Sequence, residues 1–148
     1  MVRSKNPFLF FSKKEKEEII RAIGLAEKQT SGEIRIHLEK KKTGDVEARA
    51  REIFEKIGMT QTEAKNGVLI YLNTRTHSFV LLGDSGIDAK VGNGFWEETV
   101  ARILESFKAD RMADGIVGAV KEIGEKLKTH FPYQRTDLNE LPDEISYS

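Results

Sequence analysis

The chain has 148 residues and a mass of 16.8 kDa, and its 24 basic and 24 acidic side chains give a formal net charge of zero at pH 7. This length indicates one domain that can bury a core without metal or disulfide staples, and the absence of cysteine excludes disulfides and thiolate nucleophiles. A neutral chain lacks the positive surplus of general nucleic-acid binders, and no apolar run is long enough for a membrane span, so we expect no nucleic-acid partner and no membrane span.

The first predicted element is an amphipathic helix that begins after Ser12. Ser12 and Glu15 have the spacing of a capping box, and apolar residues then recur at helical spacing until shortly before Gly32. Residues 1–11 are expected to form an N-terminal arm. Its apolar run at residues 8–11 either contacts a partner protein or folds against the domain, and the sequence leaves both alternatives open.

Residues 33–39 alternate strictly between apolar and polar side chains, which is the period of a β-strand. One face would lie on the core, and the other, with its charged residues and His37, would lie in solvent. We therefore expect a half-buried strand near an edge of the sheet. No pair among His37, His77 and His130 has metal-binding spacing, so we expect all three to be solvated or partly packed.

The middle of the chain predicts a helix followed by two strands. Asp45 can cap a helix that ends at Gly58. Residues 68–72 are apolar without alternation, which indicates a strand covered on both faces and hence the centre of the sheet. Residues 73–77 then have the character of a hairpin connection, and residues 78–82 that of the returning strand.

A glycine-rich stretch and two helices complete the predicted domain, which spans residues 12–129. Residues 83–94 hold four glycines and are expected to be a shaped loop rather than a helix or strand. The first helix carries an apolar stripe of Trp96, Val100, Ile103, Leu104 and Phe107. A second stripe runs over residues 116–127. Residues 130–148 are rich in acids and proline, so we expect an extended acidic tail that packs only in part.

The predicted strand directions bring several oxygen-bearing side chains together. Two parallel strands followed by an antiparallel partner imply a right-handed βαβ crossover and a hairpin, so the end of the third strand lies beside the starts of the first two. Glu33, Asn66, Asp84 and Asp88 would then face one cleft and offer the oxygen ligands that Ca²⁺ or Mg²⁺ prefers. The alternative is that Asp84 and Asp88 are turn residues and Asn93 a helix cap.

Several segments, in their order and spacing, resemble the TPM domain family. They are SGEIRI at 31–36, NGVLIYL at 66–72, GDSGI at 83–87 before Phe95-Trp96, DGI at 114–116, and DLNELPD at 137–143, which resembles the tail of a short bacterial subgroup. The resemblance covers about residues 12–145. It implies a three-layer α/β/α sandwich around a small mixed sheet with about four helices, in agreement with the predicted order of elements.

The resemblance also implies a chemistry. Some members of the family bind calcium or another divalent cation through acidic loop residues, and a plant thylakoid relative is assigned acid phosphatase activity and a part in photosystem II repair. Asp84 and Gly86 match the glycine-rich loop of the family, and Asp88 falls where relatives often carry an acid. Asn93 lies near a position where many relatives have Asp, so one metal ligand would be neutral.

We therefore expect a soluble TPM-like domain that binds a divalent cation, Ca²⁺ or else Mg²⁺, through Glu33, Asn66, Asp84, Asp88 and Asn93. Many relatives carry a signal peptide and a membrane anchor that this sequence lacks, so we expect a cytoplasmic form. One alternative is a metal-assisted acid phosphatase, for which Lys90 is the candidate phosphate clamp and no catalytic residue is identified. The other is a protein-interaction module whose tail or N-terminal arm contacts a partner.

Overall fold

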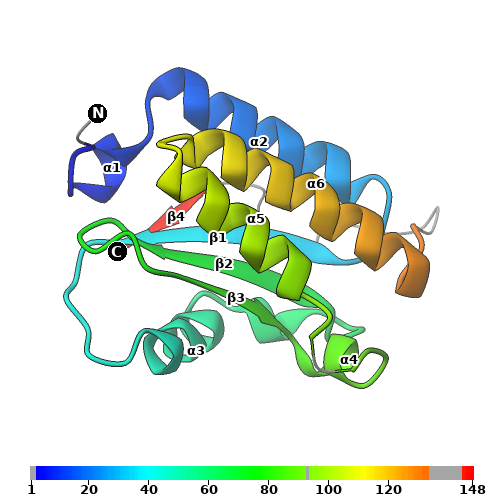
Figure 1. Cartoon of the computed structure of the whole chain (residues 1–148). Coiled ribbons are helices and arrows are strands. Elements are labelled where there is room, and N and C mark those ends of the chain that lie inside the picture. Colours follow the sequence, from blue (N-terminus) through cyan, green and yellow to red (C-terminus); the bar gives the residue numbers. More distant parts are fainter. Residues whose placement is uncertain (1–2, 93, 134–144) are drawn as a thin grey trace.

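Four strands form a mixed central sheet in the computed structural model, which describes residues 3–92, 94–133 and 145–148 (Figure 1). The order across the sheet is β3-β2-β1-β4. The strands are β1 (Glu33–Glu39), β2 (Gly67–Asn73), β3 (Phe79–Gly83) and β4 (Ser146–Tyr147). β1 pairs in parallel with β2 and with β4, whereas β3 is antiparallel to β2. The predicted parallel pair and hairpin are confirmed.

Helices cover both faces of this sheet, which gives the three layers that the resemblance implied (Figure 1). One face carries α2 (Lys13–Glu27), α5 (Glu97–Lys108) and α6 (Met112–His130), and the other carries α3 (Val46–Lys56) and the 3₁₀ helix η1 (Met59–Gln61). Two four-residue helices, α1 (Pro7–Phe10) and α4 (Ser85–Asp88), were not predicted. A helix of one turn is too short to show an apolar period in the sequence.

The predicted helix boundaries are confirmed where side chains cap them. Ser12 Oγ accepts a hydrogen bond from the Glu15 amide (3.1 Å), and Glu15 Oε1 accepts one from the Ser12 amide (2.9 Å), so α2 begins with a complete capping box. Asp45 Oδ1 accepts from the Ala48 amide (3.0 Å) at the start of α3. Gly58 follows α3 with a φ of 82°, a left-handed conformation that glycine adopts without strain.

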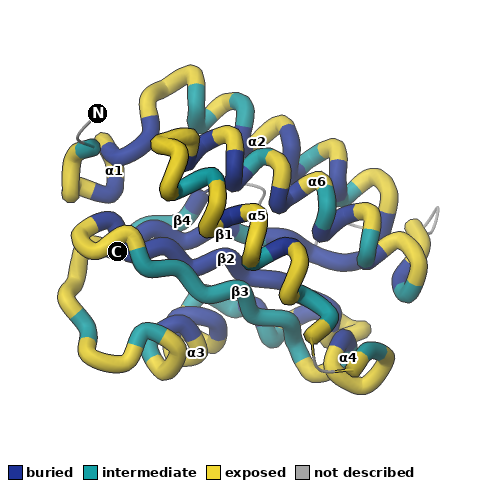
Figure 2. The backbone as a smooth tube through the Cα atoms, viewed as in Figure 1, coloured by how far each residue is buried: buried dark blue, intermediate teal, exposed yellow. Residues whose placement is uncertain are grey.

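The prediction that β1 is half exposed is wrong. β1 lies between β2 and β4, and α3 covers the face that carries its polar residues (Figures 1 and 2). Glu33, His37 and Glu39 are 4%, 2% and 1% exposed. The alternation of the sequence is real, but it separates an apolar buried face from a polar buried face.

The two ends of the chain contribute to this packing. Phe10 and Phe11 are 2% and 1% exposed and belong to the core, whereas Phe8 is exposed and stacks on Tyr147 with ring centroids 4.4 Å apart. Ile145 is buried, and β4 follows it. Most of the predicted acidic tail, residues 134–144, lies outside the described residues.

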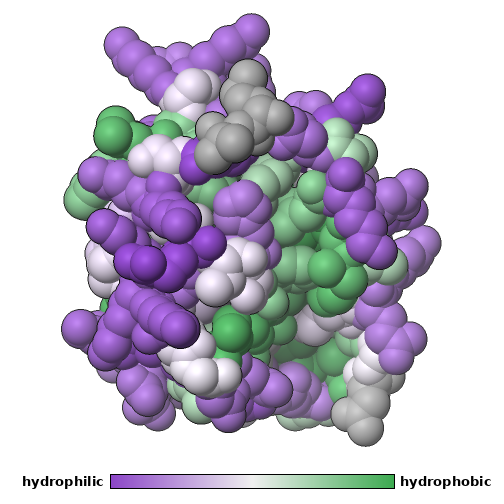
Figure 3. Space-filling view, turned by 60° about the vertical axis from the view of Figure 1, so that its left-hand side comes forward, coloured by the Kyte–Doolittle hydropathy of each residue, from purple (hydrophilic) through white to green (hydrophobic). Residues whose placement is uncertain are grey.

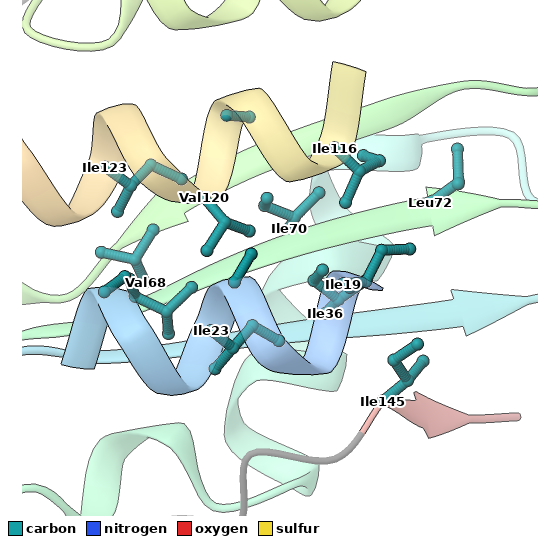
Figure 4. Packing of buried hydrophobic residues seen from close by; sticks show 14 of the residues in the cluster. Ile19, Ile23, Ile36, Val68, Ile70, Leu72, Ile116, Val120, Ile123 and Ile145 are labelled. Atoms are coloured by element: carbon teal, nitrogen blue, oxygen red, sulfur yellow. The ribbon is translucent and has the colours of Figure 1, made fainter. Parts of the chain in front are cut away.

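The main core lies between the sheet and α2 and α6. Figure 4 shows Ile23 of α2 and Val120 of α6 over Val68 and Ile70 of β2, and all four side chains are fully buried. A smaller cluster lies under α3, where Phe54 packs with Leu69, Tyr71 and other residues of the opposite sheet face. Both faces of β2 are therefore covered, as its uninterrupted apolar run predicted.

Candidate metal site

Three turns meet at one end of the sheet, where β1 and β2 begin and β3 ends. The Glu33 amide donates to the carbonyl oxygen of Asn66 (3.4 Å), and the Asp84 amide donates to that of Gly67 (2.9 Å). The Gly86 amide donates to the carbonyl oxygen of Lys65 (2.8 Å). The predicted convergence of these turns is confirmed.

The short helix α4 positions Asp84 and Asp88 at this end of the sheet. Asp84 is its N-cap, with Oδ1 accepting from the Ser85 amide (2.7 Å), and Asp88 is its final residue. A Cβ at Gly86 would lie 2.1 Å from the carbonyl oxygen of Ala64, so only glycine allows α4 to lie this close to the turn before β2. The prediction that residues 83–94 form a loop without a helix is wrong for residues 85–88.

Asp84 and Asp88 line the same cleft, between α3 and the turn that leads from β3 into α4. Its volume is about 310 Å³, and its lining includes Arg51, Glu55 and Thr60. Asp84 Oδ2 is buried and has no hydrogen-bond partner in the described structure. The same holds for Oδ1 of Asn66, a residue 1% exposed in the adjacent turn, whose amide nitrogen donates to Ser31 Oγ (3.3 Å).

Glu33, another predicted ligand, is not brought into this cleft. Glu33 is buried on the face of β1 that α3 covers, and it is not among the residues that line the cleft. Asn93 lies outside the described residues. Across residues 3–92, 94–133 and 145–148, no group of three or more His, Asp or Glu side chains could hold a metal ion. Of the predicted carboxylates, Asp84 and Asp88 line the cleft, together with Glu55, which was not predicted.

A buried polar network that the sequence did not predict lies at the other end of β1 and β2. Glu39 accepts hydrogen bonds from Arg49 Nε (2.9 Å), from the Tyr71 hydroxyl (2.5 Å) and from the Ser148 hydroxyl (3.0 Å). Burial alone would raise the pKa of Glu39, but the bonds from Arg49, Tyr71 and Ser148 lower it to about 2. Burial and the bond to Glu39 raise the pKa of Tyr71 to about 12. Both oxygens of the Glu39 carboxylate are thus bonded.

His37 joins the network through two serines of the segment that carries β4. Its Nδ1 lies 2.7 Å from Ser146 Oγ and its Nε2 lies 2.7 Å from Ser148 Oγ. Because Ser148 donates its own proton to Glu39, we assign the imidazole proton to Nε2. Burial lowers the pKa of His37 to about 4, despite the opposing effect of Glu39. The expectation of a solvated or partly packed side chain is wrong for His37.

A family model for the TPM domain matches residues 9–126, most of the chain. The chain belongs to the TPM domain family. The solution structure of the BA42 protein from the psychrophilic bacterium Bizionia argentinensis is 40% identical and covers 94% of this chain and 96% of its own, with a TM-score of 0.89. The N-terminal domain of the cg2496 protein from Corynebacterium glutamicum is 11% identical and covers 93% of this chain and 80% of its own, with a TM-score of 0.61, a likeness of fold alone.

Further comparison adds no activity to this TPM domain. No protein of curated function matches the chain. Within the described residues, none of the helices combines the length and the apolar character that crossing a membrane requires. The family match ends before β4, so the two serines that contact His37 lie beyond it.

Lys90, the candidate phosphate clamp, does not line the cleft of Asp84. Lys90 donates to the carbonyl oxygen of His130 (3.1 Å) and lies over the ring of Phe131, in a separate cleft of about 510 Å³. Lys90 is therefore not placed to clamp a phosphate group beside Asp84. Arg51, on α3, lines the Asp84 cleft instead. The sequence did not predict that Arg51 lines a cleft, because arginines on the exposed face of an amphipathic helix are common.

Proposed function

We propose that this TPM domain binds a divalent cation, Ca²⁺ or else Mg²⁺, in the cleft lined by Asp84 and Asp88. The observation that carries the proposal is the Asp84 carboxylate: Oδ1 caps α4, whereas Oδ2 is buried in the described structure without a hydrogen bond. A buried charged oxygen without a partner is costly, and a bound cation removes that cost.

The donors in the cleft suit a hard cation rather than a transition metal. Asp84, Asp88 and Glu55 supply carboxylate oxygens, and Thr60 also lines the cleft. Calcium completes its shell with carbonyl oxygens and water, so it does not need a further carboxylate. Asn66, with its unpartnered amide oxygen in the adjacent turn, is a further donor in the proposal. Glu33 does not line the cleft and Asn93 lies outside the described residues, so the proposal depends on neither.

Few protein ligands imply weak binding, with a dissociation constant of about 10⁻⁴–10⁻³ M. Calcium titration followed by amide chemical shifts tests both occupancy and location. We expect shifts at residues 84–88, and a loss of affinity of at least about tenfold in Asp84→Asn, because one charged ligand is removed. Asparagine retains the N-cap, so α4 should persist in this variant.

Asp45→Asn is the matched control, since Asp45 also caps a helix but lies at the start of α3, outside the cleft. It should bind calcium as the wild type does. Thermal unfolding should shift upward with calcium in the wild type and in this control, because only the folded state holds the site. Wild-type affinity in an Asp84→Asn, Asp88→Asn double variant would refute the proposal.

Phosphate-ester hydrolysis is a second candidate, and Arg51 is the observation that favours it. Arg51 lines the same cleft as the two aspartates, and its guanidinium could neutralise a phosphoryl group beside a bound cation. It is paired with Glu47 at 2.9 Å, and both side chains are about two-thirds exposed, so the pair can open at little cost. An aryl phosphate assay with Ca²⁺ and with Mg²⁺ tests this, and activity should fall in Arg51→Gln but not in Lys90→Gln.

A further inference from the structure

β3 forms an open edge of the sheet. It pairs with β2 on one side, and no described strand pairs with its other side. All five of its residues are half-buried, in contrast to the fully buried β2, as Figure 2 shows. The segment is Phe-Val-Leu-Leu-Gly, without a charged residue or a proline.

The hydrogen-bond register shows which backbone groups face this open side. Asn73 N donates to Ser78 O (2.8 Å) and Asp84 N donates to Gly67 O (2.9 Å), so residues 78 and 84 are bonded to the β2 chain. In an antiparallel pair such bonded positions alternate with positions that face away. The β3 residues whose N–H and C=O groups face away from β2 are Phe79, Leu81 and Gly83.

The opposite edge of the sheet is protected, which makes β3 distinctive. β4 covers the end of β1, and Glu27 Oε2 accepts a hydrogen bond from the Ile34 amide (2.8 Å) near its start. Proteins shield exposed edges by such coverage or by charges, prolines and bulges, because an open apolar edge pairs with other strands. β3 has neither a charge nor a proline.

Apolar side chains continue from β3 onto α5. Phe79 and Phe107 meet edge to face with centroids 5.4 Å apart, and a Cβ at Gly83 would lie 3.4 Å from Trp96 Nε1, so α5 runs alongside β3. Leu104, a member of the apolar stripe of this helix, is 47% exposed on α5. Figure 3 shows a hollow lined by apolar surface on the side of the molecule that carries β3 and α5.

An acidic aromatic pocket lies at the Gly83 end of this surface. Its volume is about 430 Å³, and its lining combines Asp88 and Glu97 with Phe95 and Trp96 and contains no described basic residue. Neither carboxylate forms an ion pair with another described residue. Lys126 donates to the carbonyl oxygen of Phe95 (2.6 Å) and its Nζ lies 5.0 Å from the centroid of the Phe95 ring, but it is not part of the lining. Two carboxylates beside the Trp96 ring match a lysine or arginine side chain of a partner.

We propose that the β3 edge binds an extended segment of a partner protein, in which apolar residues alternate and one lysine or arginine enters the Asp88–Glu97 pocket. The segment adds a strand to the sheet through the outward backbone groups of Phe79, Leu81 and Gly83. Main-chain bonds supply affinity in this mode, and pockets for side chains supply specificity. The charge of the pocket selects the partner.

The probe is a short peptide of alternating valine and threonine with one lysine, compared with the same peptide carrying glutamate in place of lysine. Both are titrated into the full chain with a metal chelator present, so the result does not depend on a bound cation. We expect the lysine peptide to shift the amide resonances of Phe79, Leu81 and Gly83. The glutamate peptide should bind at least about tenfold more weakly, because its charge repels the pocket.

Two variants separate this site from the cation site. Glu97→Gln, at an exposed position, should weaken the lysine peptide by about tenfold and leave calcium binding unchanged. Asp84→Asn should do the reverse. The proposal would be overturned by equal affinity for the two peptides or by chemical shift changes away from β3. It would also be overturned if the chain without peptide is a dimer that dissociates as the peptide binds. That result would assign the edge to a second copy of the chain.

Discussion

The polar side chains at the two ends of β1 and β2 differ in how completely they are hydrogen-bonded. At one end, Glu39 accepts bonds from Arg49, Tyr71 and Ser148, and both ring nitrogens of His37 have partners. At the other end, one buried oxygen each of Asn66 and Asp84 has no partner in the described structure. Both ends are built from strand termini and turns, so the difference does not follow from the type of element.

This difference separates a structural role from a binding role. A fully bonded buried network fixes one arrangement of its members and is costly to break. A buried oxygen without a partner lowers the stability of the folded protein. A ligand that supplies the missing interaction recovers this free energy, which then contributes to its binding affinity. We therefore expect mutations at the Glu39 end to change stability, and mutations at the Asp84 end to change calcium affinity more than stability.

Removing the carboxylate of the network should have the largest effect. Glu39→Ala leaves the largely buried Arg49 guanidinium without its main partner, so we expect the free energy of unfolding to fall by about 3–5 kcal/mol. Urea denaturation measures this. Glu52→Ala is the matched control, because Glu52 also pairs with Arg49 (3.1 Å) but is 68% exposed, and its loss should cost less than about 1 kcal/mol. Equal losses in the two variants would contradict a special role for the network.

Acid should weaken the same end of the sheet, beginning with His37. Its pKa is about 4 in the folded protein and 6.5 in the unfolded chain, so between these values the unfolded chain binds the extra proton. Stability is therefore complete above pH 6.5 and falls by roughly 3 kcal/mol as the pH drops to 4. The low pKa of Glu39, about 2, adds a further loss as the pH falls from 4.5 to 2.

Thermal unfolding between pH 7.5 and 4.5 measures the contribution of His37. His37→Gln should show a smaller fall over this range, because its side chain does not titrate. His77→Asn, at an exposed position, is the control for replacing a histidine. If His37→Gln loses as much stability over this range as the wild type, His37 is not the group that titrates.

A methyl group at Gly86 should produce a smaller loss of stability together with a loss of calcium affinity. The new Cβ would lie 2.1 Å from the carbonyl oxygen of Ala64, so Gly86→Ala must move α4 away from the turn before β2. We expect a loss of about 1–3 kcal/mol in urea denaturation, and weaker calcium binding because Asp84 and Asp88 move with α4. Gly44→Ala is the control, since no atom lies within 4 Å of its Cβ.

The sequence predicted the parts of this fold that depend on neighbouring residues. Ser12 and Glu15 predicted the start of α2, because a capping box involves residues only three apart in the sequence. The apolar run of β2 predicted a strand covered on both faces. The burial of Glu39 could not be predicted in this way, because Ser148 lies 109 residues away along the chain. Tyr71 gave a partial signal, since a buried hydroxyl in an apolar strand requires a hydrogen-bond partner.

For the candidate site, the sequence predicted which turns meet but not which side chains line the cleft. Strand direction placed the turns of Asn66 and Asp84 together, because it follows from the order of the elements. It could not decide which side chains enter the cleft, since the cleft lies beside β3 and β2 separates it from β1. Glu33 is on the same sheet face but is buried in β1 and does not line the cleft, while Arg51 enters the cleft from a helix that the sequence gave no reason to place there.

The distance along the chain from Glu39 to Ser148 also sets an order of events during synthesis. At translation rates of roughly 5–20 residues per second, about 5–20 s separate the appearance of these two residues at the ribosome. Throughout that interval the nascent strand β1 carries His37 and Glu39 without the serines that later bond them. Closure of the network is thus a late step in folding on the ribosome, and the edge of β1 has no β4 partner until then.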